Sequence, residues 1–81
     1  MNATQEMLKN YVRVTYRIQF PEGYNPGGRS SSDLWPRSWW DQRKKALNDP
    51  SGVEVVKAAI RATVLCPYTI TQLEIDEHPT I

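Results

Sequence analysis

The sequence has one cysteine, one histidine and no long hydrophobic run. Cys66 has no second cysteine to pair with, so an intramolecular disulfide is excluded and a reducing cytoplasm is the expected compartment. The first residues do not combine a basic region with an apolar run, and no stretch approaches the ~18 apolar residues of a membrane span. We therefore expect a soluble, cytoplasmic protein that does not contact membranes.

Residues that usually perform catalysis are equally scarce. His78 lies beside a proline near the last residue, where a solvated side chain is expected. Cys66 has no histidine near it in sequence and precedes Pro67, so we expect it to be a small buried side chain. No Cys and His residues have the spacing of a metal site. We predict a protein that is not an enzyme, with no catalytic residues, no metal and no cofactor.

Neither sign of charge is in excess. Ten Lys and Arg residues stand against nine Asp and Glu residues, which gives a formal net charge of +1. A surface that attracts nucleic acids along its whole extent is therefore not expected. The 81 residues suffice for a single domain over 1–81, and so short a chain buries only a small core.

The clearest pattern is the alternation of apolar and polar residues over 11–20. Its even-numbered residues are apolar and its odd-numbered residues include Arg13 and Arg17, which is the period of two of a strand with one buried face. A second β-rich stretch, 68–76, changes its apolar side near Gln72, which indicates a bulge or a strand covered on both sides at its start. We expect the two stretches to pair in a small antiparallel sheet.

Two helices are expected between these strands. Ser38 and Asp41 have the spacing of a weak capping box and predict a helix that runs to Leu47. A second start at Ser51 precedes apolar residues three and four apart, which indicates an amphipathic helix. Because the end of that stretch also alternates, whether 51–65 is helix or strand stays open. The predicted fold class is α+β, a small antiparallel sheet from the N- and C-terminal strands packed by two central helices.

The stretch 21–38 contains three prolines, three glycines and four serines. This composition predicts a long loop, and connections longer than ~12 to 15 residues in a compact domain are usually functional or disordered. Aromatic and leucine side chains within it favour an extended excursion held at one or two points. Short frayed tails are expected at 1–8 and 77–81.

Three tryptophans fall within six residues, among several basic residues. Trp, Tyr and Arg are the residue types that most often dominate binding energy at protein interfaces. We expect at least one of Trp39 and Trp40 to enter the core, because other large side chains are few, and Trp35 before Pro36 to stay partly exposed. The partner-binding residues that we predict are Tyr24, Arg29, Trp35, Arg37, Trp39, Arg43, Lys44 and Lys45.

The β-rich start at 11–20, the central helices, the closing strand at 68–76 and the missing catalytic residues together resemble small phage-encoded proteins that inhibit host machinery or host defence systems. The resemblance covers the general organisation and contains no diagnostic motif. It implies an inhibitor that docks on a host protein in the host cytoplasm and occludes a surface of it.

The residues themselves favour a small module that binds another protein, and the resemblance implies that this is a host or cellular protein. One alternative is a single-stranded nucleic-acid-binding protein, in which the basic residues contact phosphates while Trp35 or Tyr24 stacks on a base. The net charge disfavours that alternative. A second alternative is a structural or assembly subunit that acts as a homo-oligomer, with a homodimer as its simplest form.

Overall fold

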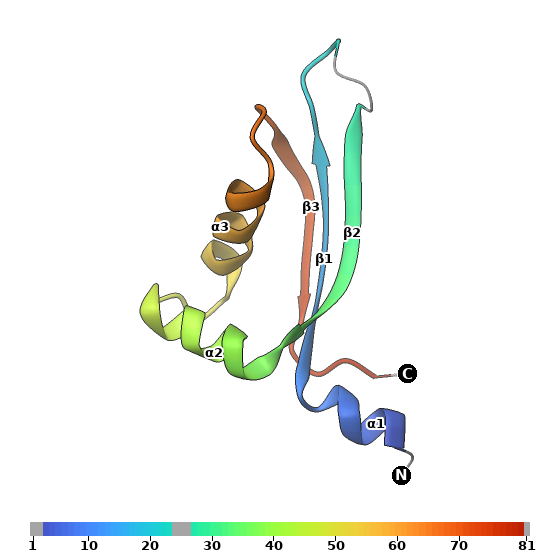
Figure 1. Ribbon diagram of the computed structural model, residues 1–81, viewed down its shortest axis with the longest axis vertical. Coiled ribbons are helices and arrows are strands. Elements are labelled where there is room, and N and C mark those ends of the chain that lie inside the picture. Colours follow the sequence, from blue (N-terminus) through green and yellow to red (C-terminus); the bar gives the residue numbers. More distant parts are fainter. Residues whose placement is uncertain (1–2, 24–26, 81) are drawn as a thin grey trace.

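A computed structural model describes residues 3–23 and 27–80. Within them the elements are α1 (Ala3–Leu8), β1 (Tyr11–Gln19), β2 (Gly28–Pro36), α2 (Arg37–Ala46), α3 (Val53–Thr63) and β3 (Thr69–Asp76). The strands form an antiparallel sheet in the order β2-β1-β3, and α2 and α3 lie on one side of it (Figure 1). The predicted α+β class is confirmed, with the N- and C-terminal strands paired and two central helices packed on the sheet.

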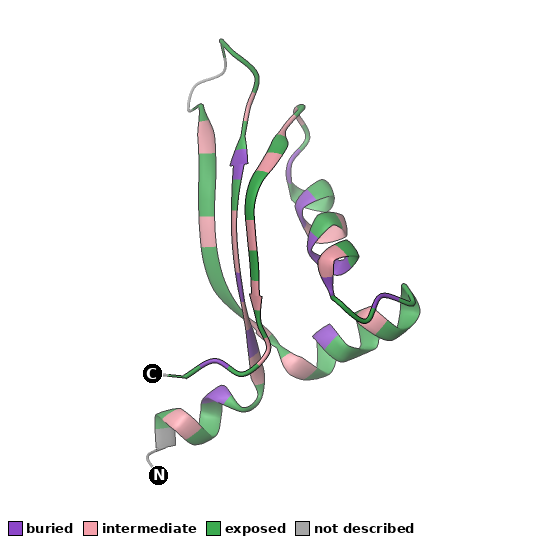
Figure 2. Cartoon of the chain, turned by 180° about the vertical axis from the view of Figure 1, so that it is seen from behind, coloured by how far each residue is buried: buried purple, intermediate pink, exposed green. Residues whose placement is uncertain are grey.

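The core lies between the central strand β1 and the two helices. The alternation of β1 places Val14 and Ile18 on the side of the helices, opposite Ile75 and Ile70 of β3. Figure 2 shows the buried positions on β1 and on the sides of the helices that face it. Full burial of an aliphatic side chain contributes ~1.5 to 3 kcal/mol, so this layer dominates the stability of the fold. The buried cluster consists of Val12, Val14, Ile18, Trp40, Val55, Val56, Ile60 and Val64.

A bulge in β3 resolves the change of apolar side seen in the sequence. Gln72 pairs with Arg17 and Ile70 pairs with Ile18, so Thr71 is an extra residue between them. The Thr71 hydroxyl donates to the carbonyl of Arg17 at 3.3 Å. The extra residue returns Ile70 to the face that carries the apolar residues further along β3, and the predicted bulge near Gln72 is confirmed.

The predicted loop at 21–38 and the two-stranded sheet are corrected by β2. Residues 28–36 pair with β1 without any shift of register. Serine hydroxyls replace the usual apolar pattern: Ser32 Oγ lies 2.9 Å from Thr15 Oγ1, and Arg17 Nε donates to Ser30 Oγ at 3.2 Å. A polar edge strand is stabilised by its ladder of backbone hydrogen bonds and by such cross-strand pairs. Because neither requires apolar residues at every second position, the sequence shows no alternation over 28–36.

Both helices start differently from the prediction. Helix α2 begins at Arg37 rather than behind a Ser38 cap, and the Arg37 backbone N–H donates to the carbonyl of Asn10 at 2.8 Å. Within 51–65, where the sequence left helix or strand open, the structure has the helix α3 over Val53–Thr63. Gly52 precedes α3 with a φ of 82°, a left-handed conformation that favours glycine.

Asp49 serves as the cap of α3. Its Oδ2 accepts the backbone N–H groups of Glu54 at 2.7 Å and Val55 at 3.3 Å, and the Ser51 hydroxyl donates to Oδ1 at 2.8 Å. Burial by itself raises the pKa of Asp49, but the hydrogen bonds from Ser51 and from the backbone outweigh it and the pKa is lowered. The ionised carboxylate therefore satisfies the otherwise unpaired donors of the first turn.

The segments predicted as frayed tails at 1–8 and 77–81 are tied to the rest of the fold over their described residues. Residues 3–8 form α1, and Leu8 is buried. Pro79 is buried as well, and Leu8 and Pro79 line the same depression. The first and last described segments therefore lie together at one end of the sheet, as Figure 1 shows.

Candidate functional site

The three tryptophans form one cluster where β2 leads into α2. The Trp35 ring meets Trp39 edge-on with centroids 5.6 Å apart, and its centroid lies 6.0 Å from that of Trp40. Trp40 is fully buried, as expected for at least one of the pair, whereas Trp39 stays 36% exposed. Consecutive helix residues point ~100° apart, so one indole enters the core while its neighbour lies at the surface.

Trp35, the tryptophan predicted to stay partly exposed, is half-buried, and Trp39 is the more exposed one. Trp35 lies opposite Val12 in the pairing of β1 and β2, so it shares the side of the sheet that the helices cover. It is half-buried and packs against the core. Pro36 restricts only the backbone before it and leaves open which face of the sheet the side chain takes.

A shallow apolar groove lies beside Trp39, between α2 and α3. Helix α2 contributes Trp39 and the 48% exposed Leu47, and α3 contributes three alanines whose short side chains leave the groove open. A second apolar depression shares Trp39 and Ala59 with this groove. We call the joined area the Trp39 surface; it consists of Trp35, Pro36, Trp39, Leu47, Ala58, Ala59 and Ala62.

Arg43 places a positive charge at the rim of the Trp39 surface. Its guanidinium carbon lies 5.5 Å from the centroid of the Trp39 ring, within the range of a cation-π contact. Arg43 also lines the groove and is exposed. The contact restricts the indole and leaves the charge available at the edge of an apolar area.

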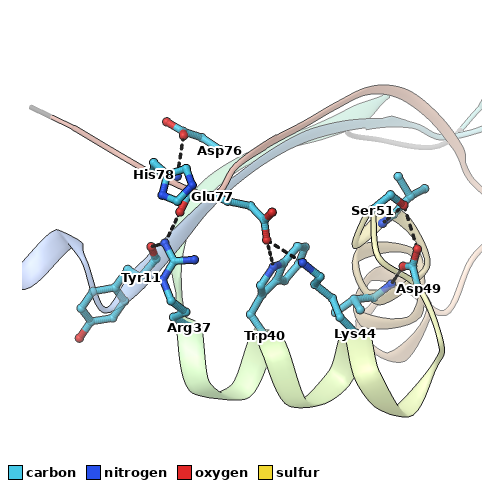
Figure 3. Close-up of polar contacts among 11 residues, drawn as sticks. Tyr11, Arg37, Trp40, Lys44, Asp49, Ser51, Asp76, Glu77 and His78 are labelled. Carbon is cyan, nitrogen blue, oxygen red and sulfur yellow. Dashed lines mark hydrogen bonds and ion pairs between the residues drawn. The ribbon is translucent and has the colours of Figure 1, made fainter.

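Arg37, by contrast, makes its hydrogen bonds within the protein. Its Nε donates to the carbonyl of Lys9 at 3.0 Å, and its Nη2 donates to the carbonyls of Tyr11 at 3.0 Å and of Glu77 (Figure 3). The guanidinium thereby joins the segment before β1 to the segment after β3. Arg37, predicted as a partner contact, is thus half-buried and directs these donors to backbone carbonyls.

Glu77 connects the same region to α2. One carboxylate oxygen, Oε1, accepts the indole N–H of Trp40 at 2.7 Å and the ammonium group of Lys44 at 2.9 Å (Figure 3). The hydrogen bond from Lys44 and, after it, that from Trp40 lower the pKa of Glu77. Lys44 is half-buried in this ion pair, so it too is held within the fold rather than presented to a partner.

The other predicted site residues do not gather at the Trp39 surface. Arg29 is exposed on β2 but lies six residues before Trp35, about 20 Å along the strand at ~3.3 Å per residue. Lys45 is exposed on α2 and does not line the Trp39 surface. Tyr24 falls outside the described residues. The basic residues assigned to phosphates in the nucleic-acid alternative are thus divided between separate places, with Arg37 and Lys44 in internal contacts.

Leu47, the alanines of α3 and Glu77 were missed by sequence reasoning. The alanines had a signal, because 58, 59 and 62 recur at helical spacing beside the apolar stripe of α3. Leu47 was placed correctly at the end of a helix, but its exposure depends on the packing of α3. Nothing local distinguishes Glu77 from the other acidic residues near it.

Comparison of the chain with protein-family models, with curated proteins and with solved structures finds no match. None of the helices in the described ranges is long and apolar enough to cross a membrane. Across 3–23 and 27–80, no three His, Cys, Asp or Glu side chains are grouped so that they could hold a metal ion. The candidate site therefore rests on its own geometry.

Proposed function

We propose that this chain is a non-enzymatic protein-binding module and that the Trp39 surface is its contact area. The observation that carries the proposal is an exposed indole fixed edge-on against Trp35 and beside Arg43, next to a groove lined by alanines. Tryptophan and arginine are the residues most often found at the energetic centre of interfaces. An indole already restricted by its neighbours loses little side-chain entropy on binding.

The shape and charge of the Trp39 surface define the partner segment. Its groove accepts large apolar side chains between Trp39 and the alanines of α3, and Arg43 at the rim attracts a carboxylate. An amphipathic segment of another protein, with an apolar stripe flanked by Asp or Glu, has both features. We propose such a segment as the occupant.

A module of this kind acts by occlusion, because binding covers the segment of the partner that other molecules need. This is the mode of action that the resemblance to small phage-encoded inhibitors implies, and inhibition of a host protein in the cytoplasm remains our proposal for the biological role. The single Cys66, which cannot form an internal disulfide, supports a reducing compartment.

The proposal is tested by quantitative affinity purification with wild type, Trp39→Ala and Leu65→Ala. Leu65 is a matched control because it is 94% exposed and lies outside the Trp39 surface. A specific partner should be recovered with wild type and Leu65→Ala and be depleted with Trp39→Ala. With that partner purified, calorimetry should show a loss of ~2 kcal/mol or more of binding free energy for Trp39→Ala.

Arg37→Ala is unsuitable for this test, because its guanidinium holds the fold and its loss changes stability as well as any binding. Recovery of the same proteins at the same level with wild type and Trp39→Ala would exclude the Trp39 surface as the contact area. A partner whose affinity depends on Leu65 instead would place the interface at the connection between α3 and β3.

A further inference from the structure

The two edges of the sheet differ in how they are protected from pairing with another strand. The edge strand β3 is interrupted by the bulge at Thr71 and carries the carboxylates of Glu74 and Asp76. In both views α3 lies beside β3 (Figures 1 and 2). Bulges, charges of one sign and covering elements are the usual means by which an edge strand avoids further pairing.

The edge strand β2 has no bulge, and its two charged side chains, Arg29 and Asp33, have opposite signs. It is nine residues long, its pairing with β1 has no shift of register, and its only proline, Pro36, is its last residue. Among the described parts of the chain, no other element lies along its outer side in either view (Figures 1 and 2). One row of its backbone N–H and C=O groups therefore points outward, and such a row is a template for one more strand.

The side chains of β2 indicate which strand fits. Arg29 and Asp33 lie opposite Ile18 and Val14, so both are on the side of the sheet that carries the helices. They are exposed, have opposite charges and stand at equal distances on either side of Ser31. A strand with this arrangement is complementary to itself when it runs antiparallel, because each charge meets its opposite in the other copy.

We propose that β2 pairs antiparallel with β2 of a second copy of this chain, with Ser31 opposite Ser31 on the two-fold axis. Arg29 of each copy then lies opposite Asp33 of the other. The Ser31 hydroxyl donates to Asp33 Oδ2 at 2.6 Å, so the two side chains lie together on that side of the sheet. Moving the axis to Ser32 separates both charge pairs, and moving it to Asp33 places two carboxylates opposite each other.

The resulting dimer has a continuous sheet in the order β3-β1-β2-β2-β1-β3. The two-fold axis is perpendicular to this sheet, so the helices and Trp39 surfaces of both copies are on the same side. Strand pairing alone buries little area compared with a permanent interface, and the dimer is therefore weak. The dimer does not use the Trp39 surface, so a test of the dimer does not depend on the proposed function.

Charge reversal tests both the dimer and its register. Sedimentation or light scattering across micromolar to millimolar concentrations should show the mass rise from 9.3 kDa toward twice that value. Arg29→Asp and Asp33→Arg each convert both attractive pairs into repulsive ones, and each should weaken dimerisation about tenfold or more. An equimolar mixture of the two variants should restore association, because every facing pair in the heterodimer then joins an aspartate of one copy to an arginine of the other.

Cysteine cross-linking provides a second measurement, made in a Cys66→Ser background. Ser31→Cys should form an intermolecular disulfide readily, since directly opposite residues have Cβ atoms ~4.5 to 5.5 Å apart. Ser30→Cys is the control, because its counterpart lies diagonally at ~7 to 8 Å and should cross-link slowly. A mass of 9.3 kDa at every concentration, no effect of the charge reversals, or equal cross-linking at both positions would overturn the proposal.

Discussion

Helix α2 has two faces with similar residue types: the residues of one face make internal contacts, and those of the other are exposed. Arg37, Trp40 and Lys44 follow one another at spacings of three and four and are held in internal contacts, with Trp40 fully buried. The other face has Trp39, Arg43 and Leu47 at spacings of four. Trp39 is 36% exposed there and Leu47 48%.

Residue type alone does not separate a structural aromatic from a binding one. An indole with a basic residue four positions further on occurs on both faces of the helix. What differs is the element opposite: Gly52 and the Glu77 carboxylate lie against Trp40, whereas α3 presents three alanines and the buried Val55 to the groove beside Trp39.

Replacement of the two neighbouring tryptophans should have very different effects on stability. Trp40→Ala removes the largest buried side chain and should lower the free energy of unfolding by ~3 to 5 kcal/mol. Trp39→Ala removes a partly exposed ring and should cost less than ~1 kcal/mol. Urea denaturation of both variants measures the difference. Equal losses would mean that Trp39 belongs to the core as much as Trp40 does.

Gly52→Ala should destabilise the protein through Trp40. A Cβ at position 52 would lie 2.1 Å from Cζ2 of the Trp40 ring, and the backbone there has a φ of +82°. Strain and overpacking together should cost about 2 to 4 kcal/mol in thermal or chemical denaturation. Gly27→Ala is the control, since no atom of the described residues lies within 4 Å of its added Cβ. A Gly52→Ala variant as stable as this control would contradict the close packing.

Two arginines of α2 provide the next contrast. Arg37→Ala leaves carbonyls of Lys9, Tyr11 and Glu77 without their charged donor and should lower the free energy of unfolding by ~1.5 to 3 kcal/mol. Arg43→Ala should change it by no more than ~0.5 kcal/mol, because this side chain is exposed. Hydrogen exchange should show α1 and the segment around Glu77 opening together in the Arg37 variant. Protection there equal to wild type would exclude the link.

The smallest effect concerns how the stability of the protein changes at acid pH when Glu77, the partner of Trp40 and Lys44, is replaced. The pKa of Glu77 is lowered in the folded protein by the hydrogen bonds of Lys44 and Trp40. A lowered pKa means that the ionised form contributes stability above the ordinary glutamate value of ~4.3 and loses it as pH falls through the folded value. Between pH ~5 and the lowered value, Glu77→Gln should therefore lose less stability than wild type.

Thermal denaturation at a series of pH values measures this difference. The pKa of Asp49 is also lowered, but Asp49 is present in both proteins and its contribution cancels. Parallel stability curves for wild type and Glu77→Gln would show that the ion pair with Lys44 has no net effect on folding. A curve for Glu77→Gln that falls more steeply than wild type would mean that the pKa of Glu77 is raised rather than lowered.

Several elements could be predicted because their signals are local. The alternation of β1 and the changed apolar side near Gln72 reflect burial of one sheet face, and the structure confirms both the strand and the bulge. Apolar residues at helical spacing favour a helix after Ser51 but leave a strand open, and the structure has a helix over Val53–Thr63. Strand β2 could not be found in this way, because its serines are stabilised by partners on β1 that lie far away in sequence.

The sequence prediction names both Trp35 and Trp39 as partner-binding residues, and the proposed Trp39 surface contains both. A cluster of three indoles in so short a stretch indicates a surface rich in binding residues, and the Trp39 surface lies there. Which indole is exposed depends on the angle at which α2 leaves β2 and on the alanines of α3. Those are properties of the packing between elements, which no local pattern records.

Local pattern in the sequence predicts the strand at 11–20, the strand at 68–76, the helix that runs to Leu47 and the segment that carries the tryptophans, because burial of one face imposes a period on neighbouring residues. Only the tertiary structure decided that 28–36 is a strand, that Trp40 is buried while Trp39 is exposed, and that Arg37 and Glu77 join the first and last described segments. Each of these depends on a contact between residues distant in the chain, and the free energy of such a contact belongs to the pair rather than to either residue alone.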